Sequence, residues 1–400
     1  MKGALAWPFV RLYVLTLLYF SANSILNVMI PLQGEALGAS NTTIGIIMGA
    51  YLFTTMVFRP WAGQFIQRHG PVRVLRAVLA VNGLALVLYA FTGLGGYFVA
   101  RVLQGVCTAF FSMALQLGII DALPDKDRSQ GISLYSLCSY MPGIIGPLIA
   151  VGMWQTGEMT VFATAMVALA VLTGATGYTA TMNGEQDTDE RQKRQQQSAS
   201  ASSSLLQSFG QLVSNPHLFR SSALMLSASL VFGAVTTFMP LYAAQLASGS
   251  AAVYLMLQAA VVVAARFALK SKIPSDGKWH TPFMTGTMLL IIVASLSISL
   301  SAAGGALLLY AGAVLMGVAQ AILYPTLTTY LSFVLPTHSR NALLGLFIAT
   351  ADLGVSLGGI VMGPIADLLS YSAMYGICAV IGLAALLIAS WRRSQRLERS

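Results

Sequence analysis

Four charged side chains lie within stretches that are otherwise apolar: Arg59, Arg101, Arg266 and Asp352. A charge at the centre of a bilayer costs roughly 3 kcal/mol on insertion scales, so each of them needs a partner or a water-filled path. A carboxyl group held between desolvation and a nearby arginine can bind and release a proton, which makes Asp352 a candidate for proton coupling. The alternative for Asp352 is a fixed ion pair with Arg59 or Arg266. Three intramembrane arginines favour an anionic or zwitterionic ligand.

Uncharged polar side chains recur at helical spacing in the same apolar stretches. One predicted helix has polar residues on one face at positions 19, 23 and 27, which are four residues apart. Another has polar residues at a spacing of three to four from 101 to 116. Amides and hydroxyls recognise polar ligands without the desolvation cost of a charge, whereas hydrogen bonding between helices is the alternative for each face. The candidate binding residues of this kind are Tyr19, Asn23, Asn27, Gln104, Gln116, Gln258, Gln320 and Tyr324.

The elements that must position these residues are predicted membrane helices. Of the 400 residues, 56% are hydrophobic and 9% are charged, whereas a soluble domain is about a quarter charged. A membrane span needs about 20 apolar residues, and the hydropathy alternates often enough for twelve spans. The predicted spans are 8–31, 43–66, 74–92, 96–122, 130–153, 160–182, 216–243, 250–271, 281–301, 304–334, 341–368 and 371–391. The sequence therefore predicts an all-α integral membrane protein.

The net charge of +9 indicates topology and not nucleic-acid binding. Apart from the three intramembrane arginines, every lysine and arginine lies near a terminus, in the central segment or in alternate loops. The positive-inside rule therefore predicts that both termini and the central segment are cytoplasmic, in a protein of the cell membrane.

No pattern typical of an enzyme, a metal site or a nucleotide site is found in the sequence. Cys107, Cys138 and Cys378 fall within predicted spans, far apart, and are expected to be buried hydrophobic side chains. We therefore expect neither a cofactor nor a metal, and no enzymatic activity.

Three nearly equal offsets, in order along the chain, predict a duplicated six-span unit. The matches are Leu123 and Arg128 with Leu335 and Arg340 at 212 residues, Arg11 and Pro31 with Arg220 and Pro240 at 209, and Arg59 and Gly70 with Arg266 and Gly277 at 207. Residues 183–215 are charged and then rich in Gln, Ser and Ala, which predicts a flexible cytoplasmic linker. The expected division is an N-terminal bundle at 1–182, the linker, and a C-terminal bundle with a short basic tail at 216–400.

Six spans, a polar linker and six related spans resemble the major facilitator superfamily, whose two halves rock about a central site. Residues 63–70 resemble its motif G-x-L-a-D-r-x-G, with Gly63 expected to permit close helix contact and Gly70 to form a tight turn. Gln67 replaces the acid of this motif, so the contacts of that acid in relatives do not carry over to this chain. Arg68 is the basic position of the motif, and a loop that only sets topology is the alternative.

Two further motifs resemble those of proton-coupled antiporters in this superfamily. The run from Arg101 to Gly105 resembles R-x-x-Q-G, and the resemblance implies a part for Arg101 in proton coupling. The run 142–147 resembles an antiporter motif that ends in Gly-Pro, here Gly146 and Pro147. Glycine and proline in this run are expected to bend the helix and let it pack on a neighbour in the other half. Close packing alone is the alternative explanation.

Longer runs resemble a narrower group, the exporters of opine-type metallophores: 1–9, 104–113, 273–280, 324–336 and 344–352. The resemblance implies export of a nicotianamine-like metallophore from the cytoplasm by alternating access, through proton antiport. Carboxylates of such a ligand would bind Arg59 and Arg266, and its amines would meet Asp352. The expected partners are this small zwitterionic or anionic molecule, protons and the lipid bilayer, with the protein acting as a monomer.

Three other functions stay open on the sequence. A multidrug exporter would carry the same antiporter motifs, although drug exporters more often use aromatic and acidic cavities. An importer fits because the same cycle can run in either direction. A non-transporting receptor would need a folded output domain, for which the predicted linker is too short and too polar.

Overall fold

The computed structural model describes residues 3–123, 125–180, 214–269, 272–274, 276–336 and 339–390, and no strand occurs within these ranges. Most of the predicted linker and the basic tail after residue 390 lie outside the described residues. So does the side chain of Gln67.

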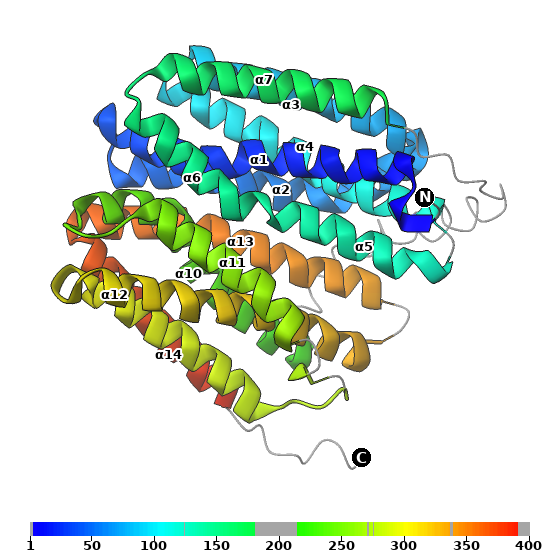
Figure 1. The fold of residues 1–400 in the computed structure, drawn as a ribbon. Helices are drawn as coiled ribbons and strands as arrows, with labels where there is room; N and C mark the ends of the chain where they lie inside the picture. The colour runs from blue at the N-terminus through cyan, green and yellow to red at the C-terminus, as the bar shows by residue number, and fades with distance from the viewer. Residues whose placement is uncertain are drawn as a thin grey trace.

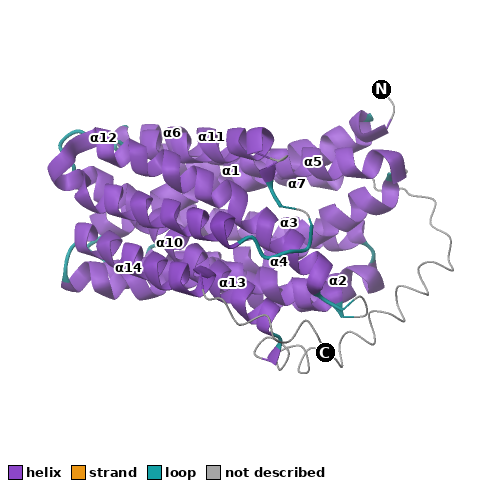
Figure 2. Cartoon of the chain, turned by 90° about the horizontal axis from the view of Figure 1, so that it is seen from below, coloured by secondary structure: helices purple, strands orange, loops and turns teal. Residues whose placement is uncertain are grey.

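Two helical bundles lie side by side, with α1–α7 above and α10–α14 below in Figure 1. The first bundle follows a short 3-10 helix (η1, Gly3–Leu5) and consists of α1 (Trp7–Ala36), α2 (Asn41–His69), α3 (Pro71–Phe91), α4 (Leu94–Ala122), α5 (Asp125–Tyr140), α6 (Pro142–Gln155) and α7 (Met159–Tyr178). The second consists of α10 (Pro216–Gln245), α11 (Ala251–Leu269), α12 (Thr281–Val334), α13 (Arg340–Leu368) and α14 (Tyr371–Ser390). Figure 2 shows that helices make up almost all of the described chain.

Eleven helices in the described part of the chain are long and apolar enough to cross a membrane, with α5 and α6 together forming one of them. The longest, α12, has 54 residues and is interrupted by Gly305, whose φ of 74° and ψ of −167° are not helical. About 20 residues cross a bilayer, so the segments on either side of Gly305 each suffice for one span. The architecture is therefore consistent with twelve crossings.

The two bundles share one contact at equivalent positions: an arginine that donates to carbonyls at the end of a helix. In the first bundle, Arg11 Nη1 donates to the carbonyl of Thr179, at the end of α7, over 3.4 Å. In the second, Arg220 donates to the carbonyls of Ile388 (3.1 Å) and Ala389 (2.6 Å), at the end of α14. A cation at a helix C-terminus binds the free carbonyls and opposes the negative end of the helix dipole. Arg11 and Arg220 match at an offset of 209 residues, so these contacts agree with the predicted relation between the two halves.

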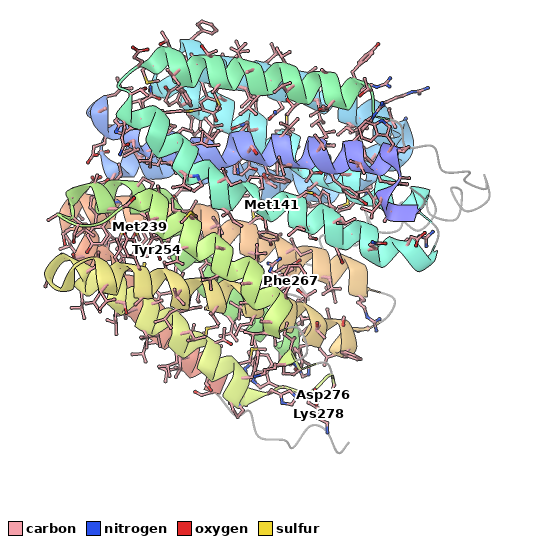
Figure 3. All side chains as sticks on the ribbon, in the orientation of Figure 1. Met141, Met239, Tyr254, Phe267, Asp276 and Lys278 are labelled. Carbon is pink, nitrogen blue, oxygen red and sulfur yellow. The ribbon has the colours of Figure 1, made fainter. Side chains whose placement is uncertain are left out.

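The break between α5 and α6 falls at Met141, labelled in Figure 3, because Pro142, the first residue of α6, has no backbone N–H to donate to the preceding turn. Met141 itself keeps helical φ and ψ angles of −53° and −39°, so the bend expected in this run stays a prediction. Packing on the other half is confirmed at Gly143, where an added Cβ would lie 3.4 Å from the Cβ of Ala259 in α11. It is wrong for Gly146, which faces its own bundle: an added Cβ there would lie 2.3 Å from Ser24 Oγ in α1.

We call the end of the molecule that carries the α2–α3 and α12–α13 loops the basic end, and the other end the opposite end. At the basic end Gly70 has a φ of 86° and Pro71 starts α3, which confirms the predicted tight turn. A Cβ added at Gly63 would have no neighbour within 4 Å, so the expected close helix contact at Gly63 is wrong for this conformation. Arg68, at this end, is exposed.

The bundles pack most closely at the opposite end, where α2 crosses α13. An added Cβ at Gly45 would lie 2.1 Å from the carbonyl oxygen of Gly359. Beside this crossing, Asp367 accepts hydrogen bonds from the backbone N–H of Asn41 (2.8 Å) and of Thr42 (2.9 Å), and from the Thr42 hydroxyl (2.6 Å). These contacts close the opposite end in this conformation.

Candidate functional site

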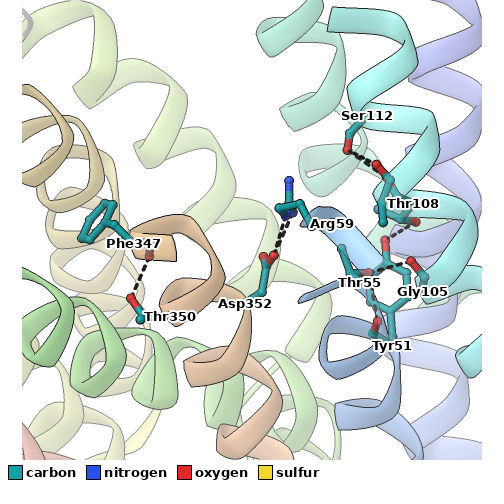
Figure 4. Close-up of polar contacts among 10 residues, drawn as sticks. Tyr51, Thr55, Arg59, Gly105, Thr108, Ser112, Phe347, Thr350 and Asp352 are labelled. Carbon is teal, nitrogen blue, oxygen red and sulfur yellow. Dashed lines mark hydrogen bonds and ion pairs between the residues drawn. The ribbon is translucent and has the colours of Figure 1, made fainter. Parts of the chain in front are cut away.

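One ion pair joins the bundles within the described part of the chain. Arg59 of α2 donates from Nε (3.0 Å) and Nη2 (2.8 Å) to Asp352 Oδ2 of α13, as Figure 4 shows. The side chains are 23% and 14% exposed, so the pair is largely shielded yet reachable. Of the two partners considered for Asp352, the structure therefore selects Arg59.

The arginine of the second repeat has a different partner. Arg266 of α11 donates from Nη2 to the Tyr140 hydroxyl over 2.8 Å, and its guanidinium carbon lies 4.0 Å from the centroid of the Tyr140 ring. Arg266 matches Arg59 at an offset of 207 residues, and Asp352 matches Tyr140 at 212. The two inter-bundle contacts are therefore repeat counterparts, with a carboxylate in one and a phenol in the other. Sequence reasoning missed Tyr140, although the offset of 212 residues applied to Asp352 points to it.

Arg101 is fully buried within the first bundle. Its Nη1 donates to Asn23 Oδ1 over 2.8 Å, and its Nη2 donates to Asn27 Oδ1 over 2.9 Å. The guanidinium carbon lies 5.3 Å from the centroid of the Tyr51 ring. No described carboxylate forms an ion pair with Arg101, and it makes no hydrogen bond to Asp352 among the described residues.

A cavity of about 230 Å³ lies between the bundles. The α1, α5 and α6 helices line one side, and α10, α11 and α12 line the other. Its polar lining residues are Asn23, Ser24, Asn27, Ser139, Tyr140, Thr236, Gln258 and Gln320. Gln258 Nε2 donates to Gln320 Oε1 across 3.0 Å. Four of the predicted binding residues, from both halves of the chain, are thus brought to one cavity.

Other predicted binding residues lie away from this cavity. The Tyr19 hydroxyl shares a hydrogen bond of 2.8 Å with Thr108, and Gln104 accepts one of 2.8 Å from Tyr89. Both belong to hydrogen-bonded seams inside the first bundle, which was the alternative for their helix faces. The predicted ligand-binding and proton-coupling residues outside the cavity lining are Tyr19, Gln104, Gln116, Tyr324, Arg59, Arg101, Arg266 and Asp352. Gln116 is exposed, and Tyr324 stacks on Phe347 with ring centroids 6.2 Å apart.

Asp367 is a second residue that sequence reasoning missed. It is an exposed acid near the end of a span, a position at which solvation is the simple expectation. The structure instead places it at the start of α2, where the free backbone N–H groups and the positive end of the helix dipole attract a carboxylate. No sequence signal identifies such a partner, because the two helices are more than 300 residues apart.

The loop between α11 and α12 carries a local acid–histidine contact. Asp276 accepts hydrogen bonds from His280 Nε2 (2.8 Å) and from the Lys278 backbone N–H (3.1 Å), and these hydrogen bonds lower the pKa of Asp276. Figure 3 shows Asp276 and Lys278 at the edge of the second bundle, and neither residue lines the cavity. Within the described part of the chain, no group of three or more His, Cys, Asp or Glu side chains is placed to hold a metal ion.

Comparison with known proteins gives one family match and several relatives. The profile of the Major Facilitator Superfamily matches residues 12–306 and 277–399. The staphylopine export protein of Staphylococcus aureus is 54% identical over 389 residues, which cover 97% of each chain. Multidrug resistance protein 2 of Bacillus subtilis is 26% identical over 109 residues, 27% of each chain.

Two solved structures share the fold. The nucleoside transporter NupG has a TM-score of 0.74 at 13% identity and covers 95% of this chain and 98% of its own. A bacterial homologue of the human lysosomal transporter Spinster, in an inward-facing and unoccupied conformation, has a TM-score of 0.72 at 14% identity and covers 98% of this chain and all of its own.

Proposed function

This chain belongs to the major facilitator superfamily, and from that premise we propose that it exports a staphylopine-type metallophore from the cytoplasm across the cell membrane. The observation that carries the proposal is the 54% identity, over 97% of both chains, to the staphylopine export protein. Membership of this family makes the chain a multi-pass membrane transporter and not an enzyme.

The chemistry of the cavity supports a zwitterionic ligand. Its polar lining residues are amides and hydroxyls without a charged side chain, and Arg266 lies directly behind Tyr140 at its wall. Arg266 and Arg59 supply guanidinium groups for carboxylates, and Asp352 supplies a carboxylate for an amine. Two arginines would not attract lipophilic cations, which are the ligands of many drug exporters.

The closed opposite end supports loading of the cavity from the basic end. The positive-inside rule assigns the basic end to the cytoplasm, so the conformation described here is the one that receives a cytoplasmic ligand. Rocking of the two bundles then opens the crossing of α2 and α13 and closes the basic end around the loop motif at residues 63–70. The protein carries out this cycle as a monomer in the lipid bilayer.

Proton coupling is proposed at the ion pair between Arg59 and Asp352. A proton on Asp352 removes the negative charge that holds Arg59, which weakens the contact between the bundles and frees Arg59 for a ligand carboxylate. The electrical part of the gradient contributes about 2.3 kcal/mol per charge per 100 mV. Arg101 contributes to coupling as a fixed positive charge inside the first bundle.

The test is a deletion of this gene in a strain that makes staphylopine. Extracellular and intracellular staphylopine are then measured by mass spectrometry, with and without a plasmid copy of the chain. The proposal predicts that deletion lowers extracellular staphylopine at least tenfold and that the plasmid restores it. Unchanged staphylopine together with new sensitivity to lipophilic cationic drugs would instead identify a multidrug exporter, the function suggested by the match to Multidrug resistance protein 2.

A further inference from the structure

We propose that Arg101 is a positioning residue that turns Asn23 and Asn27 into a carboxylate-binding pair on the cavity wall. The inference rests on the proposed function, because it concerns how the same cavity recognises the metallophore. It adds the role of each of the three residues and the part of the ligand that they recognise.

The orientation of both amides follows from the chemistry of arginine. A guanidinium group has five N–H donors and no acceptor, so a hydrogen bond from Arg101 can reach only the oxygen of an asparagine amide. The distances from Nη1 to Asn23 Oδ1 and from Nη2 to Asn27 Oδ1 are 2.8 and 2.9 Å. The two amide groups are therefore fixed, although oxygen and nitrogen of an amide are otherwise hard to tell apart.

The nitrogen of each amide is consequently free for a ligand. Asn23 and Asn27 both line the cavity, and neither Nδ2 makes a hydrogen bond within the described part of the chain. The two residues lie four positions apart on α1, so their amides are neighbours on one helix face. Two adjacent N–H₂ groups match the two oxygens of a carboxylate, and they offer nothing to an ammonium group.

The charge of Arg101 supplies a reason for an anion to bind there. The side chain is 0% exposed, and its Nε has no hydrogen-bond partner among the described residues. Its remaining contacts are weak acceptors, Met48 Sδ at 3.3 Å and the ring of Tyr51. A buried charge without a counter-ion is costly, so a ligand carboxylate on the cavity side of the two amides would offset part of the cost of burying Arg101. Hydrogen bonds to a charged donor also polarise the amides toward stronger donation.

The experiment compares ligands that differ by one carboxylate. The full-length protein is reconstituted in lipid nanodiscs, and calorimetry measures binding of metal-free staphylopine and of its monomethyl esters, each with one carboxylate masked. The proposal predicts that one ester binds the wild-type protein about 10-fold to 100-fold more weakly than staphylopine, as expected for the loss of a charge-assisted contact.

The matched variants are Asn23→Asp and Asn27→Asp. Each keeps the size of the side chain and an oxygen for Arg101, but each replaces the free N–H₂ group with an oxygen that repels a carboxylate. Staphylopine should bind each variant at least tenfold more weakly than the wild type, and the preference against that ester should disappear. Melting temperatures should not fall, because Arg101 gains a counter-ion. Ser112→Ala is the control, since the Ser112 hydroxyl bonds only to carbonyls of its own helix.

Arg101→Met tests the positioning role itself. It keeps much of the volume but releases both amides, so the preference among the esters should fall even where size-exclusion chromatography shows a folded protein. Suppose that the wild type binds staphylopine, and that both Asp variants bind it as tightly as the wild type and with the same ester preference. The proposed role of the amide pair is then overturned, while the proposed function stands. If the wild type does not bind staphylopine at all, the proposed function fails, and the assignment of this ligand to the pair fails with it.

Discussion

Asp352 and Tyr140 occupy equivalent positions in the two repeats, and each is the partner of an arginine on the other bundle. One partner is a carboxylate and the other is a phenol. The carboxylate of Asp352 neutralises Arg59, and a proton can remove that interaction. Tyr140 holds Arg266 through its hydroxyl and the face of its ring, and neither contact depends on a carboxylate. The duplicated contact therefore has one copy with a carboxylate that a proton can neutralise and one copy without a carboxylate, and the proposed proton coupling belongs to the first.

The variant Asp352→Asn removes the proposed proton-binding group and is expected to preserve the fold. The amide keeps the size of the side chain and an oxygen for Arg59 but carries no charge, so we expect export driven by an imposed pH gradient to fall more than tenfold in proteoliposomes. The protein should still purify in a folded form. Asp276→Asn is the matched control, because Asp276 is exposed and its described partners lie within its own loop. Export by Asp352→Asn at the full rate would rule out this carboxyl group as the proton carrier.

Arg266→Ala removes the guanidinium group at the cavity wall. We expect staphylopine affinity to fall about tenfold or more, measured by calorimetry on the purified protein. Tyr140→Phe keeps the ring beneath Arg266 and removes only the hydroxyl, so it should have a smaller effect. Arg59→Ala should also weaken binding. Unchanged affinity in both arginine variants would show that these residues serve gating or topology and not the ligand.

At the scale of elements, the crossing of α2 and α13 closes the opposite end of the molecule in this conformation. Glycines at 45 and 359 let the two backbones approach until there is no room for a Cβ. Asp367 then places a carboxylate at the start of α2, where the helix dipole favours it. Such a contact is closed or open as a unit, because tightly packed helices do not deform continuously.

Gly45→Ala should shift the bundles toward the conformation that is open at the opposite end. The added Cβ would lie 2.1 Å from the Gly359 oxygen, and only separation of the helices relieves this overlap. Spin labels at the exposed residues Leu37 and Leu369 should report a longer mean distance by double electron–electron resonance. Gly174→Ala is the control, since an added Cβ there meets nothing within 4 Å. Identical distance distributions in the two variants and the wild type would contradict the assigned role of this crossing.

At the scale of the whole molecule, two related bundles enclose a cavity to which both contribute amides. Neither bundle forms the cavity alone, and the contacts that close the opposite end join helices of different bundles. A relative motion of the bundles therefore changes access to the cavity without rebuilding either wall. This arrangement is what alternating access requires.

The orientation in the membrane is open to a labelling test. In a chain whose three cysteines are replaced by alanine, Glu158→Cys lies at the opposite end and Lys278→Cys at the basic end, and both positions are exposed. An impermeant maleimide added to intact cells should label Glu158→Cys and should label Lys278→Cys only after permeabilisation. The reverse pattern would place the basic end outside and contradict the assigned direction of loading.

Several features were predictable because they depend on the local chain alone. Hydropathy fixes the spans, since each must be apolar over the thickness of a bilayer. The helix break before Pro142 follows from a missing backbone N–H, and the turn at Gly70 from a φ that favours glycine. The internal offsets identify which residues are repeat equivalents, and they assign Tyr140 to the position of Asp352.

Tertiary structure alone decided which partner each polar side chain has. Helical spacing placed Asn23 and Asn27 on one face, but it did not show that Arg101 lies behind them. It likewise could not choose between Arg59 and Arg266 for Asp352. The physical reason is that the period of a helix determines which residues share a face, whereas the packing of separate helices determines what that face meets.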